Sequence, residues 1–581
     1  MPRYRSLFQT HGLTDQQWRV LRALWEQKHL TSAEISQMTL LPAPSLVGIL
    51  DRLEKKGLIG RLRSVKDRRH VHIIPTQAGR DLQAHMLPKV EQIHDSYMQR
   101  ITPEEWDELN RILNKMAELA DQRNKDVTAE PGIRGGTASL AGFLDRQHEE
   151  AYRDKVTFLD KDGVRCATSH MVPKSKEDVL QRGRAFYEWA TWSNGMFGRT
   201  PDYKNASVMA FAHAPGFLAQ GTVGQADFVQ NMTNFYDEVR LNDKVLTHTL
   251  VNPSVSHAQF ASGKFDREVA LHVIKETDIG IIVNSARLLA TLGPLADEIE
   301  VFPSTVLKAD PSNIPFAFAF AIPIATPGLK MLCRDTYDHG KSHFDTPLSS
   351  RYEEMDAVVI FDNVLVPWER IFLYGESNLC NQAFGATNAV VHMAHQVACG
   401  KLAKAEFMVG IMCAIAKAMG RDKDLATKGM IAEVMVMAET VRALLFSAEQ
   451  QAHEDQWGNF TPLRGPLDTS RNLFPKMYPR MVEIMQLLGS SSLIATPTEA
   501  DFSNDMSADV EKYFQLTHMD SRDRVALYRL AHDIAVSGFG TRQALYERFF
   551  FGPPHIMNSV YFDSYDKDSK IARVDALLAQ A

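Results

Sequence analysis

The spacing of apolar residues changes twice along this 581-residue chain, so no single type of layer accounts for its fold. Residues 139–236 carry mostly helical spacing, whereas residues 248–372 contain β-branched and aromatic runs such as GIIVNSA, FAFAFAIPI and DAVVIFDNVLV. Long amphipathic helical patterns return beyond residue 383, as in LAKAEFMVGIMCAIAKAMG. A chain of this length also exceeds one compact core. The sequence therefore predicts helices, then a β domain, then a helical bundle.

Composition is that of an ordinary globular protein, with 45% hydrophobic and 23% charged residues. The chain contains no run of about 18 apolar residues, so we expect no membrane span. Its beginning, MPRYRSLFQTHG, lacks the charged-then-apolar order of a secretory signal. The five cysteines are far apart and form no CxxC pair, which argues against a disulfide framework or a zinc ribbon. We expect a cytoplasmic protein with reduced thiols.

The net charge of −7 is divided unevenly along the chain. Residues 1–125 carry 20 Lys and Arg against 15 Asp and Glu, a net charge of +5, and the remainder carries 44 against 56, a net charge of −12. Eight basic residues gather between Arg52 and Arg69, against only Glu54 and Asp67. This asymmetry predicts two parts with different partners, the first of them a polyanion.

The first 125 residues carry the pattern of a winged helix-turn-helix. Apolar residues at helical spacing mark a helix over Leu13–Gln27, and Thr31 with Glu34 forms a capping-box pattern that opens a second helix. A third helix is expected over Ser45–Lys56, ending at Gly57. The strands Leu58–Arg63 and His70–Pro75, joined by SVKDRR, would form the wing.

A helix of this kind fits the DNA major groove, while basic side chains neutralise phosphates. The candidate DNA-binding residues lie on the start of the third helix and along the wing. They are Ser45, Gly48, Arg52, Arg61, Arg63, Lys66, Arg68 and Arg69. A basic hairpin that faces only solvent is the open alternative.

This segment resembles the MarR family of regulators, in LTDQQWRVLRAL, in LVGILDRLEKKGLI and in the DRR that precedes a strand. It is most similar to the regulators of homoprotocatechuate degradation, which are dimers that release DNA when an aromatic acid of the pathway binds. The family's first, dimer-forming helix is largely missing before His11, which argues against dimerisation and tight operator binding through this segment. DNA is therefore expected as a partner of residues 1–125.

The only break expected between the two halves is the short EPGIRGG, and from Asp126 onward the chain already resembles the oxygenase component of 4-hydroxyphenylacetate 3-monooxygenase. The motifs that carry the resemblance are GRTPDYKN, THTLVNP, KETDIGIIVNSARLLAT, TPLSSRYEEMDAVVIFDNVLVPWERIF, QLLGSSSL and GFGTRQALYERFFFG. The resemblance implies an acyl-CoA dehydrogenase-like fold behind the α+β winged helix. The expected domains are a winged helix (1–125), an N-terminal helical domain (126–243), a middle β-barrel domain (244–375) and a C-terminal helical bundle (376–581).

The corner GRTPDY raises the question of what Arg199 and Tyr203 do. Pro201 should break a helix here, so a turn is expected to present both side chains to something polar. The resemblance implies that Arg199, Tyr203 and His248 are catalytic and bind the substrate. It further places Ser304 and Thr305 where a loop that covers the substrate is expected, and ordinary loop residues are the open alternative for both.

The reaction implied is hydroxylation of 4-hydroxyphenylacetate to 3,4-dihydroxyphenylacetate, with O2 and a flavin C4a-hydroperoxide supplying the oxygen. A separate NAD(P)H-flavin reductase would supply FAD as FADH2, because GFGTRQ does not form a GxGxxG pattern between a strand and a helix. The residues expected near the flavin are Ser254, Val255, Ser256, His257, Thr291, Gln486, Gly489, Gly540, Thr541, Arg542 and Gln543. His257 stands where the family has an arginine near the flavin phosphates, which predicts weaker binding. We expect no metal.

Other interpretations stay open on sequence alone. His392 and Cys399 have the spacing found in 4-hydroxybutyryl-CoA dehydratase, but Arg199 and Tyr203 occupy the positions of that enzyme's cluster cysteines. DHGKSHFD, at residues 338–345, has the residue types of an iron site or of a mobile loop. The substrate is alternatively a chlorophenol or a hydroxycinnamate, or the enzyme half is a sensor for an aromatic-responsive regulator. A homodimer or homotetramer is expected, because a neighbouring subunit completes the flavin sites of this fold.

Overall fold

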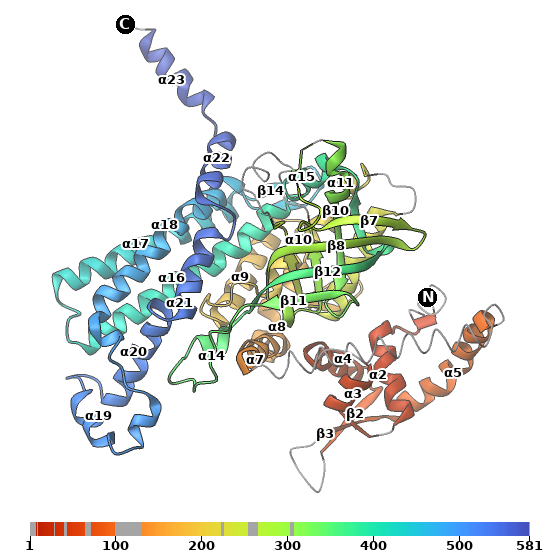
Figure 1. The fold of residues 1–581 in the computed structure, drawn as a ribbon, viewed down its shortest axis with the longest axis horizontal. Helices are drawn as coiled ribbons and strands as arrows, with labels where there is room; N and C mark the ends of the chain where they lie inside the picture. Colours follow the sequence, from red (N-terminus) through yellow and green to blue (C-terminus); the bar gives the residue numbers. More distant parts are fainter. Residues whose placement is uncertain are drawn as a thin grey trace. The chain divides into compact units, whose positions relative to one another are not determined.

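The structure is a computed structural model that describes residues 7–8, 10–27, 29–39, 43–63, 71–98, 131–221, 226–253, 265–302, 307–308 and 310–579. The chain forms two compact units, each assembled from separate stretches of sequence. The first contains residues 1–167, 218–334 and 355–382, and the second contains residues 168–217, 335–354 and 383–581. Figure 1 shows their elements, coloured along the sequence.

Three helices and a small antiparallel sheet form the beginning of the first unit, as predicted for a winged helix-turn-helix. The helices are α2 (Asp15–Glu26), α3 (Ser32–Thr39) and α4 (Ala43–Lys55). The sheet has the strand order β1 (Leu30–Thr31), β3 (Val71–Pro75), β2 (Ile59–Arg63), and α5 (Gln77–Met98) follows it. The predicted capping box is present, because the Thr31 N–H donates to Glu34 Oε2 at 2.7 Å and the Glu34 N–H donates to Thr31 Oγ1 at 3.3 Å.

The helical spacing read in the first helix produces the core of this segment. Leu21 and Leu24 of α2 are fully buried in one cluster with Ile49 and Leu53 of α4. Gly57 follows α4 with φ +68°, a left-handed conformation that glycine adopts without strain. The chain can therefore turn directly from the helix into the hairpin of β2 and β3.

The break expected at EPGIRGG is wrong, because residues 131–136 begin a helix. This helix, α7 (Pro131–Arg146), starts at the proline. A proline in the first turn of a helix removes only an N–H group that has no partner inside the helix, and its fixed φ suits helical backbone. Gly132 and Ile133 are already buried there. The pattern of proline and glycine indicated a linker, but it marks a helix start.

Two four-stranded sheets form the middle of the first unit, where β-rich sequence predicted a β domain. One has the order β13 (Ile371–Tyr374), β10 (Phe318–Pro323), β9 (Glu298–Val301), β6 (Leu246–Thr249). The other has the order β11 (Leu329–Cys333), β12 (Asp356–Pro367), β8 (Gly280–Thr291), β7 (His272–Thr277). The β6–β9 pair is parallel and the other pairs are antiparallel. Around them lie α8 (Glu150–Val156), the hairpin of β4 (Thr157–Leu159) and β5 (Arg165–Ala167), and α12 (Phe228–Asn242).

The second unit is a helical bundle built around one long buried helix. That helix, α16 (Ala389–Ala418), packs against α9 (Lys176–Trp192), α10 (Pro201–Ala212), α17 (Leu425–Gln450) and α18 (Arg464–Gly489). Further helices are α14 (Ser349–Tyr352), α19 (Ser507–Tyr513), α20 (Ser521–Ala535), α21 (Gly538–Phe549), α22 (Pro554–Ser564) and α23 (Asp568–Leu578). The short strands β14 (His453–Glu454) and β15 (Phe460–Thr461) pair between α17 and α18 in the sequence. The boundary between the two units passes through α11 (Pro215–Leu218) and α15 (Ser377–Ala386).

Among the helices of the described ranges, none is both long and apolar enough to cross a bilayer.

Candidate active site

The GRTPDY corner lies in the second unit, between α9 and α10. Pro201 occupies the first position of α10 and so begins a helix, where the sequence predicted that it breaks one. Arg199 therefore lies in the turn before the helix, as expected, but Tyr203 lies in the first helical turn. The four-residue spacing brings both side chains together, because the Arg199 guanidinium carbon is 4.4 Å from the centre of the Tyr203 ring.

Aromatic rings and one hydroxyl group hold the Arg199 side chain. The guanidinium carbon lies 4.1 Å from the centre of the Phe550 ring, and Nη1 donates a hydrogen bond of 2.8 Å to Tyr546 Oη. The Arg199 backbone N–H donates to Glu354 Oε1 at 2.6 Å. Nε of Arg199 is buried and has no acceptor among the described residues. A buried donor left without an acceptor costs free energy, so this nitrogen marks a place for a ligand oxygen.

Tyr546 is a part of this cluster that the sequence reasoning missed. Its hydroxyl donates to the Gly198 carbonyl oxygen at 3.1 Å while it accepts from Arg199. A Cβ atom on Gly198 would lie 2.7 Å from Cζ of Tyr546, so this approach requires glycine at position 198. Burial raises the pKa of Tyr546 well above its usual value, which keeps its proton in place.

An apolar wall surrounds the ring of Tyr203. Tyr203, Met393 and Val397 are buried together, with Phe384, Phe550 and Phe551 packed against them. Such a wall excludes water from the neighbourhood of the Arg199 charge, which strengthens any hydrogen bond that this charge makes.

Asp202 is a buried carboxyl group beside the corner. Its Oδ1 accepts from Gln396 Nε2 at 3.2 Å, and its Oδ2 is buried without a hydrogen-bond partner among the described residues. Burial raises the pKa of Asp202 to about 6, although hydrogen bonds from Thr200 and Gln396 act against the increase. The group therefore takes up a proton just below neutral pH.

Replacing Asp202 by asparagine should flatten the dependence of stability on pH. Because the folded pKa of about 6 lies above the ordinary 3.8, the folded state binds more protons between these values, and stability falls as the pH rises through this window. Across this window the free energy of unfolding of the wild-type protein should fall by an amount on the order of 3 kcal/mol. Urea unfolding of both proteins at pH 4.5 and pH 7 measures the difference. Parallel pH profiles would contradict the assignment.

His248 belongs to the first unit and lies on β6, the edge strand of its sheet. Thr247 Oγ1 donates to the Thr291 carbonyl oxygen at 2.6 Å, and Thr249 Oγ1 donates to the Leu288 carbonyl oxygen at 2.7 Å, both on β8. Side chains alternate along a strand, so His248 lies on the face turned away from the second sheet. It is 7% exposed and pairs in register with Glu300 of β9.

Comparison with known proteins identifies the family. Models of the N-terminal and C-terminal regions of 4-hydroxyphenylacetate 3-hydroxylase match residues 108–373 and 380–579. This chain belongs to the 4-hydroxyphenylacetate 3-hydroxylase family. A MarR family model matches residues 11–70 in addition, so both resemblances predicted from sequence are confirmed.

Relatives within the hydroxylase family cover most of the chain. The 4-hydroxyphenylacetate 3-monooxygenase oxygenase component of Thermus thermophilus is 43% identical over 79% of this chain and 93% of its own length. The same component of a Geobacillus species is 43% identical over 77% and 90%. A crystal structure of such a component, complexed with FAD and 4-hydroxyphenylacetate, matches with a TM-score of 0.74, 44% identity and coverage of 78% and 93%. An archaeal 4-hydroxybutyryl-CoA dehydratase, at 16% identity and a TM-score of 0.70, shares the fold.

The residues expected near the flavin in GFGTRQ lie at the start of α21, within the second unit. Arg542 Nη1 donates to Glu354 Oε2 at 2.6 Å, and Gln543 Nε2 donates to the Met196 carbonyl oxygen at 2.8 Å. Thr541 Oγ1 donates to the Ser537 carbonyl oxygen at 3.0 Å. A Cβ on Gly540 would lie 2.3 Å from the Ile534 carbonyl oxygen, so backbone packing requires this glycine. These contacts anchor α21 and thereby place Tyr546 one turn further on.

Two lysines enclose a carboxylate that belongs to the same helix. Glu547 accepts from Lys401 Nζ and, at 2.5 Å, from Lys404 Nζ, which also donates to Gln543 Oε1 at 2.9 Å. All three charged residues are nearly completely buried. Burial raises the pKa of the Glu547 carboxyl, but the two lysines outweigh this effect and lower the pKa to about 2. Glu547 is therefore ionised at any working pH.

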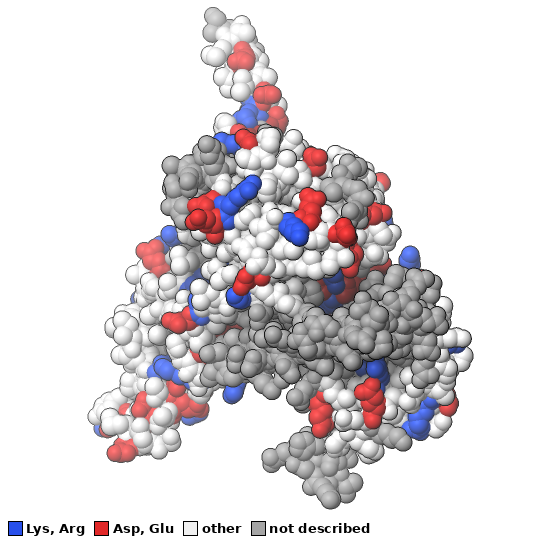
Figure 2. Space-filling model, turned by 45° about the vertical axis from the view of Figure 1, so that its right-hand side comes forward, with Lys and Arg blue, Asp and Glu red and all other residues white. Residues whose placement is uncertain are grey.

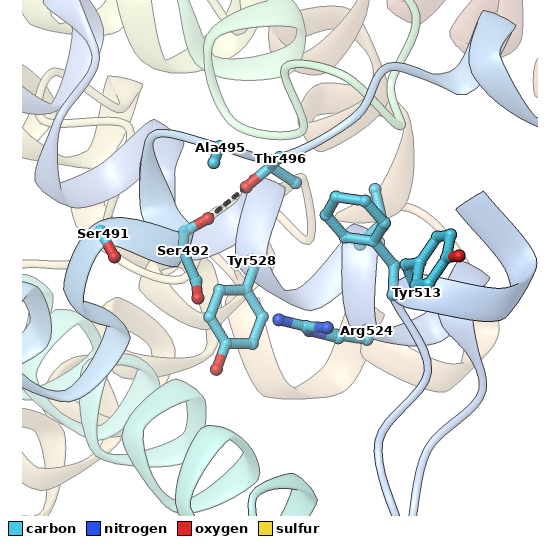
Figure 3. A pocket seen from close by; sticks show the side chains of 9 residues that line it. Ser491, Ser492, Ala495, Thr496, Tyr513, Arg524 and Tyr528 are labelled. Carbon is cyan, nitrogen blue, oxygen red and sulfur yellow. Dashed lines mark hydrogen bonds between the residues drawn. The ribbon is translucent and has the colours of Figure 1, made fainter. Parts of the chain in front are cut away.

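Gln486 and Gly489 end α18 beside a cavity of about 310 Å³. Gln486 Nε2 donates to the Ala535 carbonyl oxygen at 2.7 Å. The cavity is lined by hydroxyl groups of Ser491 and Ser492 and by Arg524, which Figure 3 shows beside Tyr528. The guanidinium carbon of Arg524 is 5.4 Å from the centre of the Tyr528 ring. Hydroxyl donors, one cation and aromatic rings suit a flat ligand that carries phosphate.

Thr291 Oγ1 donates to Asp356 Oδ1 at 2.7 Å inside the first unit. Nine predicted residues lie outside the described ranges: Ser254, Val255, Ser256, His257, Ser304, Thr305, Lys66, Arg68 and Arg69. Ser45 lies in α4 and Arg63 in β2, but their side chains are outside the description.

Two of the predicted DNA-binding arginines, Arg52 and Arg61, pair with carboxylates. Arg52 of α4, one turn after Gly48, donates from Nη1 to Asp243 Oδ2 at 3.0 Å. Arg61 of β2 pairs with Asp51 and Glu54. On the face drawn in Figure 2, Lys and Arg residues lie among Asp and Glu residues. Both arginines would have to exchange these partners for phosphates to contact DNA.

The alternative iron–sulfur interpretation finds no support in the environment of His392 and Cys399. His392 Nδ1 lies 3.1 Å from Arg182 Nη1, and the Cys399 thiol donates to the Gly183 carbonyl oxygen at 3.6 Å. In the loop DHGKSHFD, His343 Nδ1 lies 2.8 Å from Ser350 Oγ. The described residues contain no group of three or more His, Cys, Asp or Glu arranged to hold a metal ion.

Proposed function

We propose that this chain is a reduced-flavin-dependent monooxygenase that converts 4-hydroxyphenylacetate to 3,4-dihydroxyphenylacetate and carries a MarR-like DNA-binding segment. The observation that supports it most strongly is the Arg199 cluster, in which a half-buried cation retains a buried Nε donor for an oxygen ligand beside an apolar wall. The relatives named for this reaction are matched over 90% or more of their length, which supports the same chemistry here.

Arg199 would bind the phenolic oxygen of the substrate. Ortho hydroxylation needs an electron-rich ring, and a phenol loses its proton only at a pH of about 10 in water. The guanidinium cannot lose its own proton, so its charge favours the phenolate over the phenol. We assign acceptance of the phenolic proton to a ring nitrogen of His248, because imidazole titrates near neutral pH.

The described residues fit a flavin at the cavity that contains Arg524. FAD, when bound in its reduced form, supplies the electrophilic oxygen that it takes from O2. Ser491, Ser492 and Arg524 would hold phosphate oxygens, and Tyr203 with Phe550 would keep water from the reacting ring. A separate NAD(P)H-flavin reductase would regenerate the reduced cofactor. The proposal includes a homodimer or homotetramer, supported by exposed apolar side chains on α17 such as Val436 and Phe446.

Anaerobic mixing with FADH2 and 4-hydroxyphenylacetate, followed by oxygen, tests the proposal. We expect 3,4-dihydroxyphenylacetate in near-equal amount to the flavin oxidised. Oxidation of the flavin to peroxide without any catechol, for this phenol and for a chlorophenol and a hydroxycinnamate, would sink the monooxygenase assignment. In that case the enzyme half would be a sensor for the DNA-binding segment. Catechol from another phenol alone would correct the substrate and keep the reaction class.

DNA binding by the wing is tested by the double substitution Arg68→Ala with Arg69→Ala. Each phosphate contact releases counterions, so losing two contacts should reduce the slope of log affinity against log salt concentration by about 2. Arg19→Ala with Arg22→Ala on α2 removes the same charge away from the predicted interface and serves as the control. Equal salt slopes for the two double variants would argue against the wing.

A further inference from the structure

The contacts of Arg199 assign a task to a residue from the far end of the chain. We propose that Tyr546 is a positioning residue for Arg199, which fixes the guanidinium so that its Nε edge is presented to the phenolic oxygen. The inference rests on the proposed function, because it concerns the same reaction. It adds a residue that neither the motif GRTPDY nor the names of the relatives indicate.

The planar guanidinium group offers donors along distinct edges. Tyr546 Oη accepts from Nη1 of Arg199 at 2.8 Å, whereas Nε, on the other side of the group, is buried without an acceptor among the described residues. Nε and Nη2 share one edge, which binds an anionic oxygen in a side-on geometry. With Nη1 already bonded, the edge that is left for a ligand is the one containing Nε.

Stacking alone does not orient this edge. Tyr203 and Phe550 fix the distance of the guanidinium from their rings, at 4.4 and 4.1 Å, but a cation over a ring face is free to rotate within its own plane. A hydrogen bond to one nitrogen removes this freedom, because it requires a defined direction. Tyr546 therefore supplies the directional contact and the two rings supply the distance.

Tyr546 is itself held rigidly, as a positioning residue must be. Its hydroxyl donates to the Gly198 carbonyl oxygen at 3.1 Å, next to Arg199 in the chain, and its ring centre lies 4.8 Å from that of Phe550. The Arg542 guanidinium carbon lies 5.0 Å from the same ring, and Arg542 is ion-paired to Glu354. Glu354 in turn accepts from the Arg199 backbone N–H. The contacts form a closed loop around Arg199.

Tyr546→Phe removes one oxygen atom and leaves the ring. We expect kcat for hydroxylation to fall by about 10- to 100-fold with a smaller change in KM, because a misoriented group costs about this much in rate. The matched control is Tyr478→Phe, since Tyr478 is a fully buried tyrosine of the same bundle and its hydroxyl has no hydrogen-bond partner among the described residues. This control should retain wild-type kcat.

A double-mutant cycle separates positioning from independent action. If Tyr546 acts through Arg199, Tyr546→Phe should cost little in an Arg199→Lys background, so that the two effects are not additive. Additive effects, or a wild-type kcat for Tyr546→Phe, would overturn the inference. Substantial hydroxylation by Arg199→Ala would instead overturn the proposed function of the site, so the two failures are distinguishable.

A readout without turnover uses 4-nitrophenol and protein loaded with oxidised FAD. The phenolate form absorbs visible light, so its ionisation in the bound state is measured directly by pH titration. We expect the wild-type protein to shift this ionisation to lower pH, and Tyr546→Phe to reverse most of the shift while Tyr478→Phe leaves it in place. A shift in Tyr546→Phe would support the positioning role, since a purely structural defect does not move this ionisation in a folded protein. Identical titrations for wild type and Tyr546→Phe would count against that role.

Discussion

Alanine at position 199 should lower the catechol formed per flavin oxidised by at least about 100-fold, and alanine at position 248 should have a similar effect. In the proposed mechanism, Arg199 carries the charge that favours the phenolate and His248 accepts the phenolic proton. Neither substitution removes the reaction of reduced flavin with oxygen, so peroxide should accumulate in place of catechol. Product analysis after the anaerobic mixing experiment measures both quantities.

The matched controls for these two variants are an exposed arginine and an exposed histidine of the second unit. Arg442→Ala on α17 and His453→Ala on β14 should keep wild-type product yields. Thermal unfolding of all four variants checks that the fold survives. Hydroxylation that persists in both Arg199→Ala and His248→Ala would remove these residues from the mechanism.

Glu547→Leu should destabilise the second unit by about 3–5 kcal/mol, because it leaves Lys401 and Lys404 charged and buried without their carboxylate. Urea unfolding at neutral pH measures this difference. Most of the lost free energy of unfolding should be regained when both lysines are also replaced by methionine, since an apolar core can substitute for a buried ion cluster. The rescue distinguishes lost charge pairing from lost shape.

Glu433→Leu is the control for position 547. Its bidentate pair with Arg480 is exposed, with side-chain accessibilities of 37% for Arg480 and 40% for Glu433, and should contribute only a small fraction of the buried cluster's effect.

Lowering the pH provides a second test of the role of Glu547. Because the folded pKa of Glu547 lies near 2, below the ordinary 4.5, its contribution is present above pH 4.5 and is lost as the pH falls towards 2. The difference between wild type and Glu547→Leu should narrow over this range.

Local signals predicted local structure well in the winged helix. Thr31 and Glu34 satisfy each other's backbone donors regardless of the rest of the chain, so their pattern was sufficient to place a helix start. Proline was harder to interpret. Pro131 and Pro201 both indicated interruptions, yet each stands in the first turn of a helix. A proline excludes only the helix interior, and the sequence does not say on which side of it the helix lies.

The candidate site was predictable only in part. The motif around Arg199 and Tyr203 drew attention to both residues, and their roles stay predictions. Tyr546 was missed because it lies 347 positions from its partner Arg199, and no local pattern records a hydrogen bond across that separation. The nearest signal was Arg542, which shares a helical face with Tyr546 four residues later. Tertiary packing, which no spacing rule encodes, decides which of the two reaches Arg199.

The close approach of Tyr546 to Gly198 also constrains how this protein can evolve. A methyl group at position 198 would overlap the tyrosine ring, whereas a smaller residue at position 546 would leave room for it. The residues at these two positions are therefore expected to change together. A side chain larger than glycine at position 198 would clash with Tyr546 beside Arg199 unless the residue at position 546 is smaller.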